Sequence, residues 1–154
     1  MIAFTVEDTD FGLFGNRVVD TSRHCAGEDL TETDLHYSLF PCRVTLNIDG
    51  VALVGPRRRV PLFDFLACVA RLVKALREEV ATSMGFTESA DRVHVRPVGG
   101  GNVEISTSDS DLIVQIGRLE LIDALVAFLA DGRALLTDNI AGIQRNPMFS
   151  KLET

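Results

Sequence analysis

Apolar and polar residues alternate most clearly in the stretch VTLNIDGVALV, residues 44–54. Alternation with a period of two is typical of a strand that buries one face, and here it is interrupted by an Asp-Gly pair. Because that pair readily takes the two positive φ angles of a type I′ turn, we expect a two-residue hairpin. The hairpin pairs Ile48 with Val51 and Leu46 with Leu53, which places the apolar side chains on one face.

Two further stretches repeat apolar residues every three or four positions, as amphipathic helices do. The first helix is predicted over residues 61–82, with Pro61 at its first position and Gly85 beyond its end. The second helix is predicted over residues 119–140. Gly132 interrupts its apolar pattern and marks a kink, a close contact or a break between two shorter helices.

Shorter stretches predict the other strands. They are IAFTV at 2–6, LHYSLF at 35–40, DRVHVRPV at 91–98, NVEIST at 102–107 and DLIVQIG at 111–117. The glycine run Gly99–Gly101 and the following Asn102 join two of them. A phosphate-binding P-loop needs a Lys and a helix after its glycines, and here a strand follows without a Lys. We therefore interpret the run as a hairpin turn.

The short connections between the strands favour antiparallel pairing, and each amphipathic helix must bury one face. We therefore predict a single α+β domain over residues 1–154. Its expected architecture is one antiparallel sheet of about five to six strands, with two amphipathic helices packed on one face. Residues 7–34 are predicted as a long acidic loop and residues 141–154 as a C-terminal tail.

The acidic side chains gather in the first quarter of the chain. The net charge is −7, and residues 1–40 hold eight acidic and two basic side chains, against 14 and 13 in residues 41–154. A protein that binds duplex nucleic acid needs a surplus of Lys and Arg to neutralise phosphates, so we expect no nucleic-acid partner. A charged partner, if there is one, is expected to be basic.

No motif of a catalytic, cofactor or metal site is recognisable. GxSxG, HExxH and CxxC are absent, and the histidines His24, His36 and His94 stand far apart. The sequence therefore predicts no catalytic residue, no cofactor and no metal ion, with His94 facing outward from its strand. The basic run Arg57–Arg59 has no neighbouring aromatic residue, so we interpret it as a solvated loop or as a partner for acidic groups.

The cysteines indicate a reducing compartment. Cys25, Cys42 and Cys68 form an odd and sparse set, unlike a disulfide framework. No run of about 18 apolar residues is present, and the N-terminus shows neither the basic nor the apolar region of a secretion signal. We therefore expect a cytoplasmic protein that does not enter a membrane.

The layout of these elements resembles that of small bacterial immunity proteins of polymorphic toxin and contact-dependent inhibition systems. The resemblance rests on VTLNIDGVALV, PLFDFLACVARLVKALREE, VHVRPVGGGNVEIS and LIDALVAFLADGRALL, and it covers residues 35–140 as architecture. It implies a cytoplasmic protein that binds and blocks one toxin domain, often a basic nuclease. It assigns no residue roles, because such proteins share no strict motif.

The leading hypothesis is a non-enzymatic protein-binding domain, an immunity-like inhibitor of a basic toxin domain. Opposite charge steers association and aromatic side chains anchor interfaces. The expected partner-binding residues are Glu28, Asp29, Glu32, Asp34 and Tyr37. Two alternatives stay open: a small-ligand-binding or enzymatic domain with a pocket between sheet and helices, and a structural homo-oligomer subunit.

Overall fold

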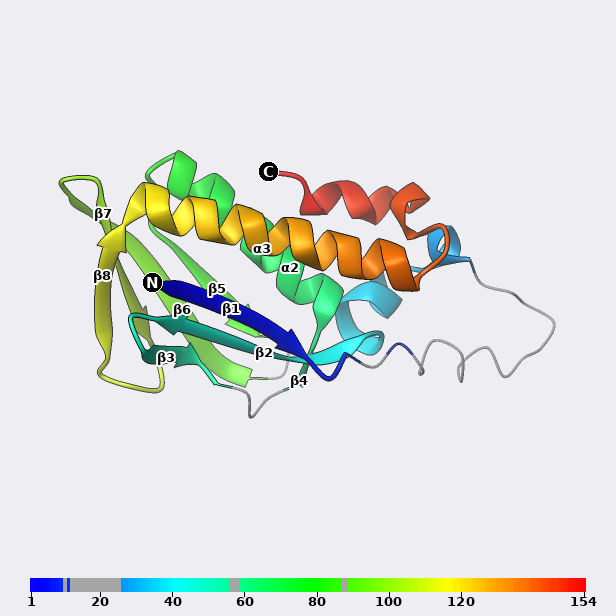
Figure 1. The fold of residues 1–154 in the computed structure, drawn as a ribbon, viewed down its shortest axis with the longest axis horizontal. Helices are drawn as coiled ribbons and strands as arrows, with labels where there is room; N and C mark the ends of the chain where they lie inside the picture. The colour runs from blue at the N-terminus through cyan, green and yellow to red at the C-terminus, as the bar shows by residue number, and fades with distance from the viewer. Residues whose placement is uncertain (10, 12–25, 56–58, 87–88) are drawn as a thin grey trace.

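The computed structural model describes residues 1–9, 11, 26–55, 59–86 and 89–154. In these residues the chain forms eight strands, two long α-helices and four shorter helical turns. The strands build two antiparallel sheets of four strands each, and the two helices lie side by side and contact both sheets (Figure 1). The α+β class is therefore confirmed, whereas the prediction of one sheet of about five to six strands is wrong.

The first sheet is built around one long central strand. Its members are β1 (Ile2–Glu7), β2 (Pro41–Ile48), β3 (Val51–Val54) and β4 (Arg59–Pro61). β2 pairs with β1 over most of its length, with β3 near its end and with β4 near its beginning. The pairing of β1 with β2 brings the first strand of the chain back to the hairpin that the sequence predicts most clearly.

The predicted hairpin between β2 and β3 is present, with one change of register. The Asp-Gly pair takes φ angles of 49° and 84°, as a type I′ turn requires. Ile48 pairs with Val51 as predicted, but Leu46 pairs with Val54 rather than with Leu53. The reason is a β-bulge next to Leu46, which adds one residue to one side of the ladder.

The second sheet is a meander whose strands follow one another in space as in sequence. Its members are β5 (Thr82–Phe86), β6 (Ser89–Gly99), β7 (Asn102–Thr107) and β8 (Ile113–Gly117). Gly99–Gly101 joins β6 to β7 with φ angles of 86°, 61° and 75°, so the interpretation of this run as a turn is confirmed. The sequence predicted three of these strands and missed β5.

The helix α2 (Leu62–Arg77) separates the two sheets along the chain. It ends earlier than the predicted range 61–82, because the chain turns at Glu79, whose φ is 56°, and then enters β5. β4 leads directly into α2 and β5 follows it, so the strands before and after the helix have no short hairpin between them. The strands before α2 and the strands after it therefore form two separate sheets.

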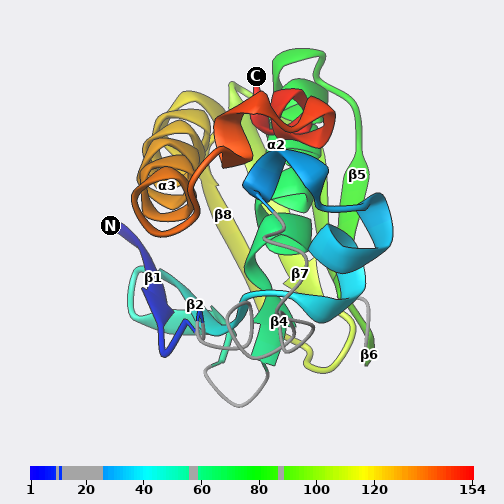
Figure 2. The ribbon, with the colours of Figure 1, turned by 90° about the vertical axis from the view of Figure 1, so that its right-hand side faces the viewer.

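The second helix, α3 (Arg118–Asn139), is continuous and crosses close to α2 (Figure 2). A Cβ atom on Gly132 would lie 2.4 Å from the Cδ2 of Leu66, so this glycine marks a close contact rather than a kink or a break. The ring of Phe128 stacks on Phe4 with 4.7 Å between centroids and meets Phe65 edge-on at 5.8 Å. Aromatic packing thus joins α3 to both α2 and β1.

Residues 35–40 do not form the expected strand. Asp34–Ser38 form a π-helical turn, η2, in which Leu35 and Leu39 are both buried while Tyr37 is exposed. A spacing of four residues places two apolar side chains on one side of a helical turn, just as alternation places them on one side of a strand. The apolar pattern alone was compatible with either structure, so the prediction of a strand is wrong.

The remaining turns lie near the chain's C-terminus and in the predicted acidic loop. They are the 3₁₀ turns η1 (Gly27–Asp29), η3 (Ile143–Arg145) and η4 (Pro147–Leu152). Residues 10 and 12–25 of the predicted loop lie outside the described residues, and so do Arg57 and Arg58. The stretch expected to be a tail, residues 141–154, carries η3 and η4 and buries Ile143, Phe149 and Leu152.

Candidate functional site

The residues expected to bind a partner lie in residues 26–38, which we call the acidic segment. This segment lies beside the C-terminal segment, residues 141–154, at one end of the molecule (Figure 2). The amide of Gly27 donates a hydrogen bond to the carbonyl of Ala141 over 2.9 Å. A Cβ atom on Gly27 would lie 2.6 Å from the amide nitrogen of Ile143, so the two backbones touch at this position.

Asn146 holds the two segments together from the inside. Only 3% of this residue is exposed, and its Nδ2 donates to the carbonyls of Gly27 and Leu30, each over 2.9 Å. Its Oδ1 accepts from the amide of Met148 at the start of η4. Because three backbone groups depend on this one side chain, Asn146 fixes the path of the acidic segment.

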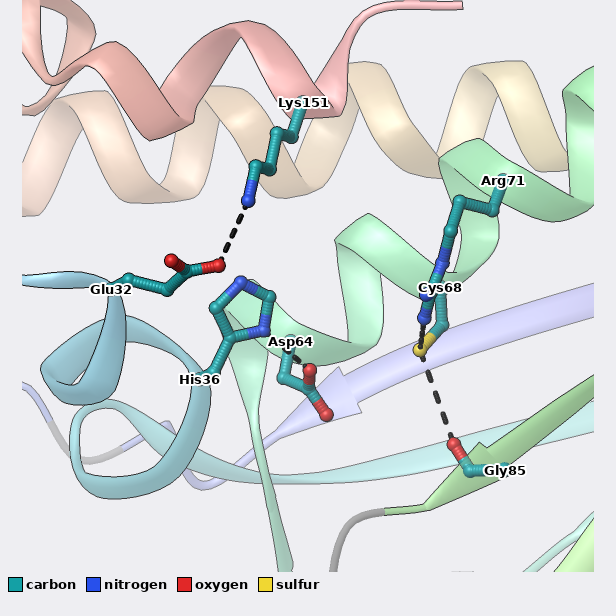
Figure 3. A network of polar contacts seen from close by, with 7 residues as sticks. All are labelled: Glu32, His36, Asp64, Cys68, Arg71, Gly85 and Lys151. Carbon is teal, nitrogen blue, oxygen red and sulfur yellow. Dashed lines mark hydrogen bonds and ion pairs between the residues drawn. The ribbon is translucent and has the colours of Figure 1, made fainter.

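Two ion pairs close the same contact at the surface. Glu28 pairs with Arg145, and the Oε1 of Glu32 lies 2.9 Å from the Nζ of Lys151 (Figure 3). The hydrogen bond from Arg145 lowers the pKa of Glu28, and that from Lys151 lowers the pKa of Glu32. Two of the four expected docking carboxylates are therefore already neutralised by the chain itself.

Asp34 serves the local structure of the segment. Its Oδ2 accepts from the amide and the hydroxyl of Thr31, over 3.1 and 2.7 Å, and its own amide donates to the Oγ1 of Thr31 over 3.2 Å. This reciprocal pattern is that of a capping box, which starts the helical turn that follows. The sequence Thr-x-x-Asp carries this signal, and reading it would have favoured a helical turn over a strand.

Asp29 and Tyr37 are the expected binding residues that stay available. Asp29 is exposed, and within the described part of the chain its carboxylate has no ion pair or hydrogen bond. Tyr37 is 60% exposed, whereas Leu35 and Leu39, two positions to either side, are buried. The structure thus presents one free carboxylate and one aromatic ring on a segment that is fixed at its base.

Within the acidic segment, His36 points into the molecule and meets the start of α2. Its Nδ1 lies 2.6 Å from the Oδ1 of Asp64 (Figure 3). Its ring lies edge-on to Phe63, with 5.5 Å between the ring centroids. The Nε2 atom is buried and has no hydrogen-bond partner among the described residues. An Asp–His pair of this kind orients the ring as in catalytic triads, but here the second nitrogen is closed off from solvent.

The described cysteines belong to the core. Burial raises the pKa of Cys42 to about 12 and also raises the pKa of Cys68. The Sγ of Cys68 accepts from Arg71 over 3.0 Å and lies 3.9 Å from the carbonyl oxygen of Gly85 (Figure 3). A buried thiol with a raised pKa is a poor nucleophile, so Cys68 serves as a small apolar residue of the core.

The other candidate ligands do not come together. His94 is exposed, as predicted for a residue that faces outward from β6, whereas His24 and Cys25 lie outside the described residues. Across the described ranges, no group of three or more His, Cys, Asp or Glu side chains is placed to hold a metal ion. Within the same ranges, no helix has the length and apolar content to cross a bilayer.

Comparisons with known proteins leave the chain without a family. No protein-family model, no curated protein and no solved structure matches it. The geometry of the acidic segment therefore has to carry any functional conclusion.

Sequence reasoning missed the residues that hold the acidic segment in place. Asn146, Arg145 and Lys151 lie more than 115 positions away from their partners, so no local pattern connects them. A weaker signal exists in the pair Asn146-Pro147, because Asn at the cap and Pro at the first position typically begin a helical turn. That signal predicts η4 but not the contact with the acidic segment.

Proposed function

We propose that this protein is a non-enzymatic protein-binding domain, an immunity-like inhibitor of a basic toxin domain. The observation that carries the proposal is the rigid mounting of the acidic segment with Asp29 and Tyr37 left exposed. A binding surface that is fixed before the partner arrives loses little conformational entropy on association. Tyrosine is a frequent anchor of protein interfaces, and an exposed carboxylate attracts a basic partner.

The structure narrows the set of residues that a test should change. Glu28 and Glu32 are bound to Arg145 and Lys151, so charge reversal there disturbs the fold of the segment as well as its charge. Asp29 is the carboxylate whose reversal leaves the described contacts intact. The proposal therefore concentrates on Asp29 and Tyr37 rather than on all five expected residues.

The alternatives have less support from the packing. Between the helices and the first sheet, where a small-ligand pocket was the alternative expectation, the ring of Phe128 stacks on Phe4 and meets Phe65 edge-on. The buried Nε2 of His36 gives a substrate no approach from solvent.

The test begins with the tagged full-length protein purified from its source cells, with any stoichiometric partner identified by native mass spectrometry. We expect a protein with a basic domain that arrests growth when expressed alone and is harmless when co-expressed with this chain. The combined change Asp29→Lys and Tyr37→Ala should weaken the complex by at least about tenfold, as loss of an interface anchor does.

The matched control is Asp123→Lys, which reverses an exposed carboxylate on α3 and should leave affinity unchanged. The proposal fails if no stoichiometric protein partner is found or if the partner has no toxicity for this chain to relieve. It also fails if the Asp29 and Tyr37 variant binds as tightly as the unchanged protein.

A further inference from the structure

The last strand of the second sheet has an unpaired edge. β8 pairs with β7 from Ile113 to Gly117 and is the terminal strand of its sheet (Figure 1). In the part of the chain that the structure describes, no hydrogen bond joins the other side of Ile113–Gly117 to another element. A strand in this position presents a row of backbone N–H and C=O groups that a further strand can pair with.

Two apolar side chains at the beginning of this edge are exposed to solvent. Ile113 is 61% exposed and the preceding Leu112 is 47% exposed, whereas Ile116 faces the core. Residues 112–117 contain neither a charged residue nor a proline. Proteins commonly protect a free edge against further strand pairing with charged residues or proline. The edge of β8 has neither along residues 112–117. At the opposite edge of the sheet β5 contacts α2, and β8 itself contacts α3, the helix that follows it.

Carboxylates stand at both ends of this edge. Asp109 and Asp111 precede β8 and Glu120 follows it, all three are exposed, and none forms an ion pair with a side chain among the described residues. Arg118 turns away to bind Glu79 over 2.8 Å. The α-amino group near Glu120 is itself hydrogen-bonded to Asp49. The ends of the edge are therefore negative while its middle is uncharged.

We propose that this edge, defined by Asp109–Gly117, is a docking site for an extended basic segment of a partner protein. The segment adds to β8 as a further antiparallel strand, with apolar side chains beside Leu112 and Ile113 and with Lys or Arg near the flanking carboxylates. Backbone pairing gives such a complex its affinity, and the alternate side chains give it specificity.

A second copy of the chain is a poorer occupant of the same edge. Antiparallel pairing of two β8 strands about Gln115 brings Asp111 of each copy towards the first turn of α3 in the other copy, where Glu120 lies. Like charges then meet at both ends of the pair, which disfavours self-association, whereas a basic segment places opposite charges there. Charge thus selects a basic partner strand over a dimer.

This proposal rests on the proposed function only because both assume a basic protein partner. The surface at β8 is different from the acidic segment. The probe is the synthetic peptide KKVTVTVKK, titrated at low salt into the full chain and compared with EEVTVTVEE. Amide hydrogen exchange should slow by at least about tenfold in β8 on binding of the basic peptide, because its outer N–H groups gain partners. Exchange in β5 should not change.

Two variants examine the side chains and the charges separately. Ile113→Lys places a cation on the edge and should weaken peptide binding by at least about fivefold, with the fold intact because the residue is exposed. Asp109→Asn combined with Asp111→Asn should weaken binding by about threefold at low salt and less at high salt. Asp123→Asn combined with Asp131→Asn, two exposed positions on α3, is the charge-matched control.

The proposal is overturned if neither peptide changes exchange in β8, or if the acidic peptide protects it as well as the basic one. It is also overturned if light scattering shows a dimer that Ile113→Lys dissociates, since a second copy then covers the edge. A captured toxin partner whose binding is weakened by the Asp29 and Tyr37 changes but not by Ile113→Lys would support the proposed function. It would show that only the docking site at β8 is wrong.

Discussion

At the scale of single residues, the side chains that organise the candidate site are not the ones with the most evident chemistry. Asn146 is an ordinary polar residue in sequence, yet its amide satisfies the buried carbonyls of Gly27 and Leu30. Tyr37, by contrast, stands out in sequence as the only tyrosine, and the structure leaves it exposed. Asn146 fixes the acidic segment in place, and Tyr37 is the aromatic side chain that this segment exposes to solvent.

The change Asn146→Ala should therefore cost stability well beyond that of a surface amide. Removing the side chain takes the hydrogen-bond partner from the buried carbonyl of Leu30 and from the amide of Met148, while the carbonyl of Gly27 keeps the amide of Leu30 over 3.4 Å. Each buried group left unsatisfied costs about 1–3 kcal/mol. We expect the free energy of unfolding, measured by urea titration, to fall by at least about 2 kcal/mol.

The matched control is Gln144→Ala, which removes an exposed amide two positions away. It should change the free energy of unfolding by less than about 0.5 kcal/mol. Equal losses in the two variants would show that Asn146 does not hold the acidic segment through its hydrogen bonds.

At the scale of elements, periodicity identified both long helices and most strands but misjudged the end of one helix and the type of one element. The chain leaves α2 at Arg77 because Glu79 adopts a positive φ, and nothing in the run of apolar residues up to Val80 indicates that turn. Residues 35–40 became a helical turn because a spacing of four suits both structures. Gly132 was noticed as unusual, and only its neighbour Leu66 explains why it is glycine.

The change Gly132→Ala separates helix propensity from packing. Propensity alone favours alanine by about 1 kcal/mol in a helix interior. The new Cβ would lie 2.4 Å from the Cδ2 of Leu66, and overpacking of a core costs about 1–3 kcal/mol. We expect a net loss of unfolding free energy of up to about 2 kcal/mol in urea titration.

A double-mutant cycle with Leu66→Val isolates the contact. The shorter side chain makes room for the Cβ, so Gly132→Ala should cost less in that background than in the unchanged chain. An equal cost in both backgrounds would mean that the contact between α2 and α3 at this point does not require glycine.

At the scale of the whole molecule, the distribution of charge changes when the chain folds. The sequence places the acidic surplus in residues 1–40, but Arg145 and Lys151 return from the C-terminal segment to pair with Glu28 and Glu32. Carboxylates without an ion pair among the described residues remain at Asp109 and elsewhere along the second half of the chain. A basic partner can therefore meet negative charge on more than the acidic segment.

The ion pairs of Glu28 and Glu32 should appear in the pH dependence of stability. Both carboxyl groups have a folded-state pKa below the ordinary value of 4.5, so the unfolded chain binds their protons more readily. Their contribution is present above that value and is lost as the pH falls through the lowered pKa values.

The double change Glu28→Gln and Glu32→Gln removes this contribution. Between about pH 6 and about pH 3, the variant should lose less unfolding free energy than the unchanged chain, as measured by urea titration at each pH. Asp131→Asn should reproduce the behaviour of the unchanged chain. If the pH profiles of the double variant and the unchanged chain run parallel, the two ion pairs do not form in solution.

The sequence by itself determined the local structure of this protein. Alternation and an Asp-Gly pair predicted the hairpin of β2 and β3, the glycine run predicted the turn between β6 and β7, and helical spacing predicted α2 and α3. These features depend on residues that are close in sequence, because φ preferences and the spacing of apolar residues act over short stretches of the chain. The tertiary structure alone decided that the strands form two sheets and that Asn146 holds the acidic segment. It also decided that Ile113 lies on an open edge. Those outcomes depend on contacts between residues far apart in the chain, and no local period encodes which of them meet.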